Sequence, residues 1–155
     1  MVLGPGGAPA SDWLKLAEDL LRRAEARRKD ATAALGRGDY PEAVRYSQEL
    51  VELSLKASLR MVGVEYPKVH DVGKVLKAER RRFPPSFSDR IERLADVSKE
   101  LAENRAAAMY GVEAQGKGAS EIFGKEEAEA SLAEAKEVLE RAQALRGELA
   151  GPSGG

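Results

Sequence analysis

The stretch from Asp39 to Val62, DYPEAVRYSQELVELSLKASLRMV, constrains the fold of this chain most strongly. Asp39 and Glu42 have the spacing of a capping box, and Pro41 stands where the first turn of a helix tolerates proline. Gly63 follows the last residue of the stretch and is placed to end the helix. The stretch therefore predicts one helix with defined ends.

One side of this helix collects apolar and small side chains over an arc broader than the roughly 100° stripe of a surface helix. These residues are Ala43, Val44, Ser47, Leu50, Val51, Ser54, Leu55, Ala57, Met61 and Val62. Such an arc predicts the centre of a bundle, packed from at least two sides. Tyr46 and Leu53 lie on the otherwise polar side, and an apolar pair there is one way in which an interface between subunits shows in a sequence.

Hydrophobic periodicity and end signals predict three further long helices. They run from Ser11 or Asp12 to about Leu35, from Ser86 to Tyr110, and from about Lys125 to Ala150 with an inner line that continues to Leu149. A short helix from Asp71 to about Arg82 is ended by two prolines. No stretch alternates apolar and polar residues as a half-buried strand does. The prediction is an all-α fold, an up-and-down antiparallel bundle of four long helices plus one short helix.

A single domain of residues 11–150 is expected between a disordered leader, residues 1–10, and a disordered tail, residues 151–155. The glycine-containing segment VEAQGKGASEIFG is predicted to be a mobile connector, because its spacing matches no phosphate-binding loop. The longest uncharged run, MVLGPGGAPA, is too short for a membrane span or for the apolar part of a signal peptide. We therefore expect a cytoplasmic protein with no membrane partner.

Charge and composition exclude several kinds of site. The 25 Lys and Arg against 26 Asp and Glu give a net charge of -1, so a nucleic-acid surface can only be a local patch. The basic side chains of the first helix, among them Arg23 and Arg27, are interleaved with acidic ones and form either such a patch or a solvated face. The chain has no cysteine and one histidine, His70, so neither a metal nor a cofactor is predicted.

Arg105 is the anomaly of the helix that ends at Tyr110, because it falls in the middle of that helix's apolar line. A charge on a buried stripe is costly unless it is paired or reaches solvent. One interpretation is that the aliphatic stem of Arg105 covers the core and its head reaches water near the helix end. The other is that Arg105 lines a cleft and binds phosphate.

Four segments carry a resemblance to a known family. They are the stretch DYPEAVRYSQELVELSLKASL, the loop that ends in His70 and Asp71, the motif NRAAAMYG, and the helix EEAEASLAEAKEVL. In their order, over roughly Leu14 to Ala144, the chain resembles the HEPN domain family. The resemblance implies a helical bundle that forms a homodimer. It also implies either metal-independent RNase activity or partnership with a minimal nucleotidyltransferase in a toxin-antitoxin pair.

The RNase signature of that family is an arginine, usually followed by a polar residue, and a histidine after four to six further residues. Arg105 matches the arginine, but Ala106 follows it, Asn104 precedes it, and Tyr110 stands where the histidine is expected. A tyrosine with a pKa near 10 is a poor proton acceptor at neutral pH, where histidine titrates. The motif is therefore degenerate for cleavage, although Arg105 keeps its ability to bind phosphate.

The function predicted from these observations is an HEPN-like module that binds RNA or a nucleotide and has little or no RNase activity. Arg105, Asn104 and Tyr110 are the predicted binding residues, and a nucleotidyltransferase is the predicted partner protein. Two alternatives stay open. One is an active RNase in which His70 replaces the missing histidine, which requires the loop to fold over the arginine helix. The other is an adaptor bundle that binds only another protein.

Overall fold

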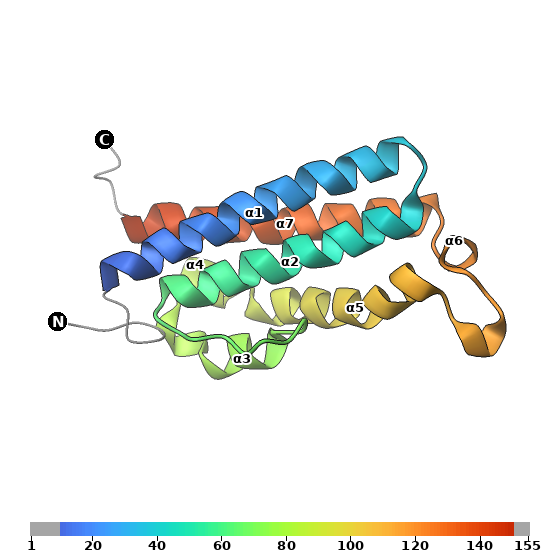
Figure 1. Ribbon diagram of the computed structural model, residues 1–155. Helices are drawn as coiled ribbons and strands as arrows, with labels where there is room; N and C mark the ends of the chain where they lie inside the picture. The colour runs from blue at the N-terminus through green and yellow to red at the C-terminus, as the bar shows by residue number, and fades with distance from the viewer. Residues whose placement is uncertain (1–9, 151–155) are drawn as a thin grey trace.

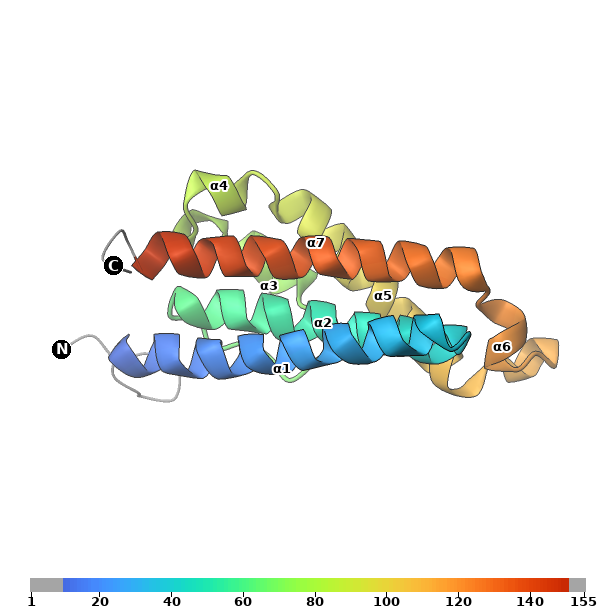
Figure 2. The same cartoon turned by 90° about the horizontal axis from the view of Figure 1, so that it is seen from above.

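The computed structural model describes residues 10–150, which form helices joined by short connections (Figure 1). The four long helices are α1 (Ala10–Gly36), α2 (Tyr40–Met61), α5 (Ile91–Tyr110) and α7 (Lys125–Ala150). The short elements are α3 (Gly73–Ala78), η2 (Arg80–Arg82), α4 (Pro85–Ser88), η3 (Glu113–Gln115) and α6 (Ala119–Ile122). The long helices alternate in direction along the bundle (Figures 1 and 2). The all-α bundle is confirmed over the described residues, whereas the expected leader and tail lie almost wholly outside them.

The helix α2 is the centre of the bundle, as predicted. It packs against α1, α7 and α5, while α5 also packs against α3. Six consecutive residues, Ser54–Leu59, are buried, which requires neighbours around the whole circumference of that part of the helix. The hydroxyl groups of Ser47, Ser54 and Ser58 donate to carbonyl oxygens one turn earlier in the same helix, so these polar groups are satisfied inside the core.

Both ends of α2 follow the sequence signals. The side chain of Asp39 accepts a hydrogen bond from the backbone nitrogen of Glu42 at 3.4 Å, which caps the first turn. At the other end Gly63 adopts a φ of +80°, a left-handed conformation that favours glycine. A side chain at this position would also collide with the ring of Trp13. Gly63 therefore both ends α2 and leaves room for the beginning of α1.

Four details differ from the prediction. The short helix expected from Asp71 to about Arg82 is divided into α3, which ends at Ala78, and the 3-10 turn η2. The helix expected from Ser86 to Tyr110 is divided into α4 and α5, with Arg90 as the cap residue of α5. Phe87 of α4 stacks on Phe83 with 4.4 Å between the ring centroids, so α4 is held to the preceding segment. Leu149 is 40% exposed and does not continue the inner line of α7. The expected connector contains η3, α6 and a backbone bridge between residues 112 and 117.

The two left-handed glycines that flank α2 allow a matched test. Gly63→Ala is expected to cost the left-handed penalty of about 1–2 kcal/mol plus a further ~1–3 kcal/mol of overpacking against Trp13. Gly38→Ala has a similar φ of +78° but open space around the new methyl group, so only the first penalty applies. Urea denaturation of the two variants measures the difference. Equal losses of stability would contradict the packing assigned to Trp13.

Candidate functional site

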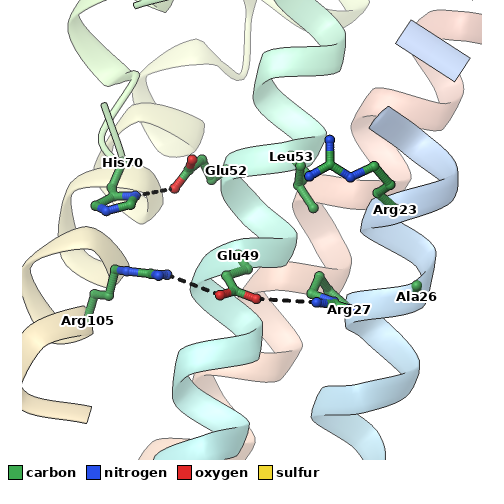
Figure 3. Close-up of a pocket in the computed structure, with 8 residues that line it drawn as sticks. All are labelled: Arg23, Ala26, Arg27, Glu49, Glu52, Leu53, His70 and Arg105. Atoms are coloured by element: carbon green, nitrogen blue, oxygen red, sulfur yellow. Dashed lines mark hydrogen bonds and ion pairs between the residues drawn. The ribbon is translucent and has the colours of Figure 1, made fainter. Parts of the chain in front are cut away.

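An open pocket of about 320 Å³ crosses the side of α2 that carries its charged residues (Figure 3). The helix α2 provides the floor, α1 provides one wall, and the opposite wall comes from α5 and the loop before α3. The lining residues are Arg23, Ala26 and Arg27 of α1, Glu49, Glu52 and Leu53 of α2, His70 of the loop, and Arg105 of α5. The pocket therefore joins four segments that are far apart in the sequence.

Arg105 reaches this pocket with its head only partly exposed. One terminal nitrogen donates to Gln48 Oε1 at 2.5 Å and lies 3.4 Å from Glu49 Oε1. The side chain retains 22% of its exposure. No bond within the described residues engages Nε or the second terminal nitrogen of Arg105. These donors form one edge of the planar group, which is the geometry that binds two oxygens of a phosphate.

Glu49 is the acidic centre of the pocket floor. Arg45 donates to its carboxylate at 3.1 Å, Arg105 approaches at 3.4 Å, and Arg27 lies 3.8 Å away on the other side. One carboxylate is thus surrounded by three guanidinium groups from three helices. The two longer distances leave Arg27 and Arg105 only loosely bound to Glu49. Because Arg27 pairs closely with Asp30 at 2.8 Å, Arg105 is the cation that can turn to another anion.

Glu52 holds the loop histidine in place. Its Oε1 accepts from Gln48 Nε2 at 2.9 Å and lies 2.7 Å from His70 Nδ1, while its Oε2 accepts from Lys56 Nζ at 2.8 Å. Burial disfavours the ionised carboxyl group, but the hydrogen bonds from Lys56, Gln48 and His70 outweigh burial and lower the pKa of Glu52. An ionised Glu52 keeps the proton of His70 on Nδ1 and leaves Nε2 directed away from it.

Gln48 connects the two halves of this network. Only 1% of the residue is exposed, and its amide accepts from Arg105 with Oε1 and donates to Glu52 with Nε2. A buried amide left without partners is costly, so both bonds are expected to persist. The chain of contacts runs from Arg105 through Gln48 and Glu52 to His70. It ties α5 and the loop to the central helix.

The structure brings together two of the four predicted site residues. Arg105 and His70 line the same pocket, because the loop after α2 folds back and brings His70 beside α2 and α5. Tyr110 is 72% exposed and does not line the pocket, because five residues along α5 turn its side chain about 140° away from that of Arg105. Asn104 precedes Arg105, is half-buried, and does not line the pocket either.

The apolar pair on the polar side of α2 has partners within the chain. Leu53 lines the pocket. The ring of Tyr46 is covered by the guanidinium groups of Arg45 at 4.5 Å and Arg27 at 5.7 Å. The two residues therefore form no exposed apolar patch, and the predicted homodimer rests on the family resemblance alone.

Sequence reasoning did not single out Gln48, Glu49 or Glu52. Gln48, Glu52 and Lys56 follow one another at four-residue spacing, which places them in one line along a helix. Set beside the broad apolar arc of α2, this line indicates polar groups that need partners from other elements. That signal was available in the sequence.

Neither a metal site nor a membrane span is found among residues 10–150. No group of three or more His, Cys, Asp or Glu side chains is arranged to hold a metal ion. Within the same range, no helix has the length and apolar character that crossing a membrane requires.

The lowered pKa of Glu52 leads to a pH-dependent prediction. Because the folded pKa lies below the ordinary value of 4.5, the stability from ionised Glu52 is complete above that value and is lost as the pH falls through the folded pKa. Glu52→Gln should flatten the loss of stability below about pH 4.5 and reduce stability near neutral pH by about 1–3 kcal/mol. Denaturation curves over this pH range test it, with the exposed Glu103→Gln on α5 as the control. An unchanged acid profile in Glu52→Gln would contradict the network.

Comparison with known proteins agrees with this architecture. A search of curated protein sequences finds no match to the chain. Among solved structures, the chain is similar to TT1696 from Thermus thermophilus, with 27% sequence identity and a TM-score of 0.57. The similarity covers 87% of this chain and 96% of that one. Residues 17–145, which include all eight lining residues of the pocket, match the HEPN domain. The chain therefore belongs to the HEPN domain family.

Proposed function

We propose that the pocket on α2 binds a phosphate group of RNA or of a nucleotide. The observation that carries the proposal is the partly exposed guanidinium group of Arg105, which uses one terminal nitrogen within the protein and keeps its remaining donors free. Arginine offers a fork of donors that matches two phosphate oxygens, and the bond is strengthened by charge. Arg105 is thus the anchor of the proposed site.

The charges around Arg105 support binding of an anion. Arg23 lines the pocket, is exposed, and makes no hydrogen bond or ion pair with another residue of the range 10–150. Each of the two carboxylates on the floor already has a close cationic partner other than Arg105, namely Arg45 at 3.1 Å from Glu49 and Lys56 at 2.8 Å from Glu52. An incoming phosphate therefore meets donors whose nearest acidic neighbours are neutralised.

Loss of the anchor should weaken binding of a short single-stranded RNA. Charge-assisted hydrogen bonds contribute about 1.5–3 kcal/mol, so Arg105→Ala should reduce affinity on the order of ten-fold or more. Fluorescence anisotropy of a labelled RNA measures the affinity, with EDTA present to remove metal ions. Lys99→Ala removes an exposed cation from the same helix outside the pocket and should change affinity little. If both variants lower the affinity for RNA equally, binding depends only on general charge attraction and the proposal fails.

The second candidate is metal-independent RNA cleavage, favoured by the presence of His70 and Arg105 in one pocket. Nε2 of His70 would take the proton of a ribose 2′-hydroxyl, and that oxygen would attack the phosphorus. The 5′-oxygen would leave with a proton from solvent, and a 2′,3′-cyclic phosphate would remain. Glu52 would hold the imidazole in the required tautomer, and Arg105 would stabilise the charge on the phosphoryl oxygens.

Cleavage and binding separate in the variant His70→Ala. For a cleaving enzyme, His70→Ala should lower the cleavage rate by about 10²–10⁴-fold and change RNA affinity much less, because the histidine acts on the proton and Arg105 on the phosphate. Single-turnover cleavage in EDTA, beside anisotropy on the same protein, measures both. If the wild-type chain binds RNA without cleaving it, phosphate binding is the only candidate function that remains. Cleavage that His70→Ala retains would exclude His70 as the base.

A further inference from the structure

The two ends of the pocket differ in chemistry. Figure 3 places His70 and Arg105 at one end and Arg23, Ala26 and Leu53 towards the other, with Glu49 and Glu52 between them. The proposed function uses the first end, where hydrogen bonds and charge fit a phosphate. The second end combines an apolar floor with the planar cation of Arg23. The proposed function uses the charge of this cation but not its flat face.

The second end has the features of a surface for a flat, partly apolar ring. Leu53 is half-buried on α2 and packs against the core, which fixes its position in the floor. Ala26 of α1 adds a small wall. Arg23 stands one turn earlier on α1, and its guanidinium group has no partner within residues 10–150. A guanidinium plane stacks on the face of an aromatic ring while its edge stays in water.

The size of the pocket limits what it can take. About 320 Å³ is at the lower end of the volumes of ligand pockets and fits one nucleotide better than several. A base inside a duplex is stacked and paired, so it reaches such a pocket only after it is unpaired. Stacking on a guanidinium plane reads no base edge, so little sequence preference follows from it.

Resting on the proposed function, we infer that the pocket takes one unpaired nucleotide of a single strand. Its base lies between the guanidinium plane of Arg23 and the side chain of Leu53, and its phosphate lies at Arg105. The ligand class is single-stranded nucleic acid or a free nucleotide, and double-stranded nucleic acid is excluded. Arg23 then contributes to the affinity by stacking on the base, whereas Arg105 contributes by binding the phosphate.

The test compares strands that differ only in their bases. The probes are a 2′-O-methyl uridine strand of about six units, the same sugar-phosphate strand without bases, and a duplex of the same length. The 2′-O-methyl groups prevent attack by the 2′-oxygen, so affinity is measured without cleavage. The single strand should bind on the order of ten-fold more tightly than the strand without bases. It should also bind more tightly than the duplex.

Two conservative variants separate stacking from charge. Arg23→Lys keeps the positive charge and removes the plane, so it should abolish most of the advantage of the strand with bases and leave the affinity for the strand without bases unchanged. Arg22→Lys is the control, because Arg22 pairs with Asp19 at 3.5 Å and does not line the pocket. An unchanged advantage in Arg23→Lys would overturn the inference.

The outcomes also distinguish the inference from the proposed function. If strands with and without bases bind equally and Arg105→Ala weakens both, the phosphate site stands and the base site is wrong. If a duplex binds as tightly as the single strand, the base site is likewise wrong and the phosphate site stands. If none of the three probes binds, both the inference and the proposed function are wrong.

Discussion

The burial of α2 on several sides is the constraint on which the site depends. A helix at the centre of a bundle cannot turn all its polar residues to water, so Gln48 must find partners where it lies. It finds Arg105 on α5 and Glu52 on its own helix, and Glu52 in turn holds His70. The bonds that satisfy the buried amide are therefore the bonds that assemble the pocket. Stability and the proposed phosphate binding therefore depend on the same few contacts.

Local signals predicted most of the fold. Asp39 and Gly63 mark the ends of α2, and the width of its apolar arc placed it at the centre of the bundle. These features depend on neighbours in the sequence, which a single chain displays. The division between α4 and α5 falls at Asp89 and Arg90, and Arg90 caps α5 without a side-chain hydrogen bond. No glycine or proline at these two positions, and no preferred capping residue at position 90, marks the break in the sequence.

The site was predicted in part, and the shortfalls at His70 and Tyr110 have different causes. Arg105 stood out because a charge interrupted an apolar line, which is a one-helix pattern. The position of His70 depends on how a loop without regular structure crosses α2, so its proximity to Arg105 could only be an alternative. Tyr110 was assigned from the spacing of the family motif, but five residues along a helix turn its side chain about 140° away from that of Arg105, and it points to solvent.

A crystal structure with a bound 2′-deoxy dinucleotide, which cannot be cleaved through a 2′-hydroxyl, tests the central claim most directly. We expect a phosphate within hydrogen-bond distance of the free edge of Arg105 and a base against Leu53. The buried amide of Gln48 should keep its bonds to Arg105 and Glu52. A dinucleotide bound on another face, with the pocket unchanged and Arg105 turned only to Gln48 and Glu49, would contradict the account.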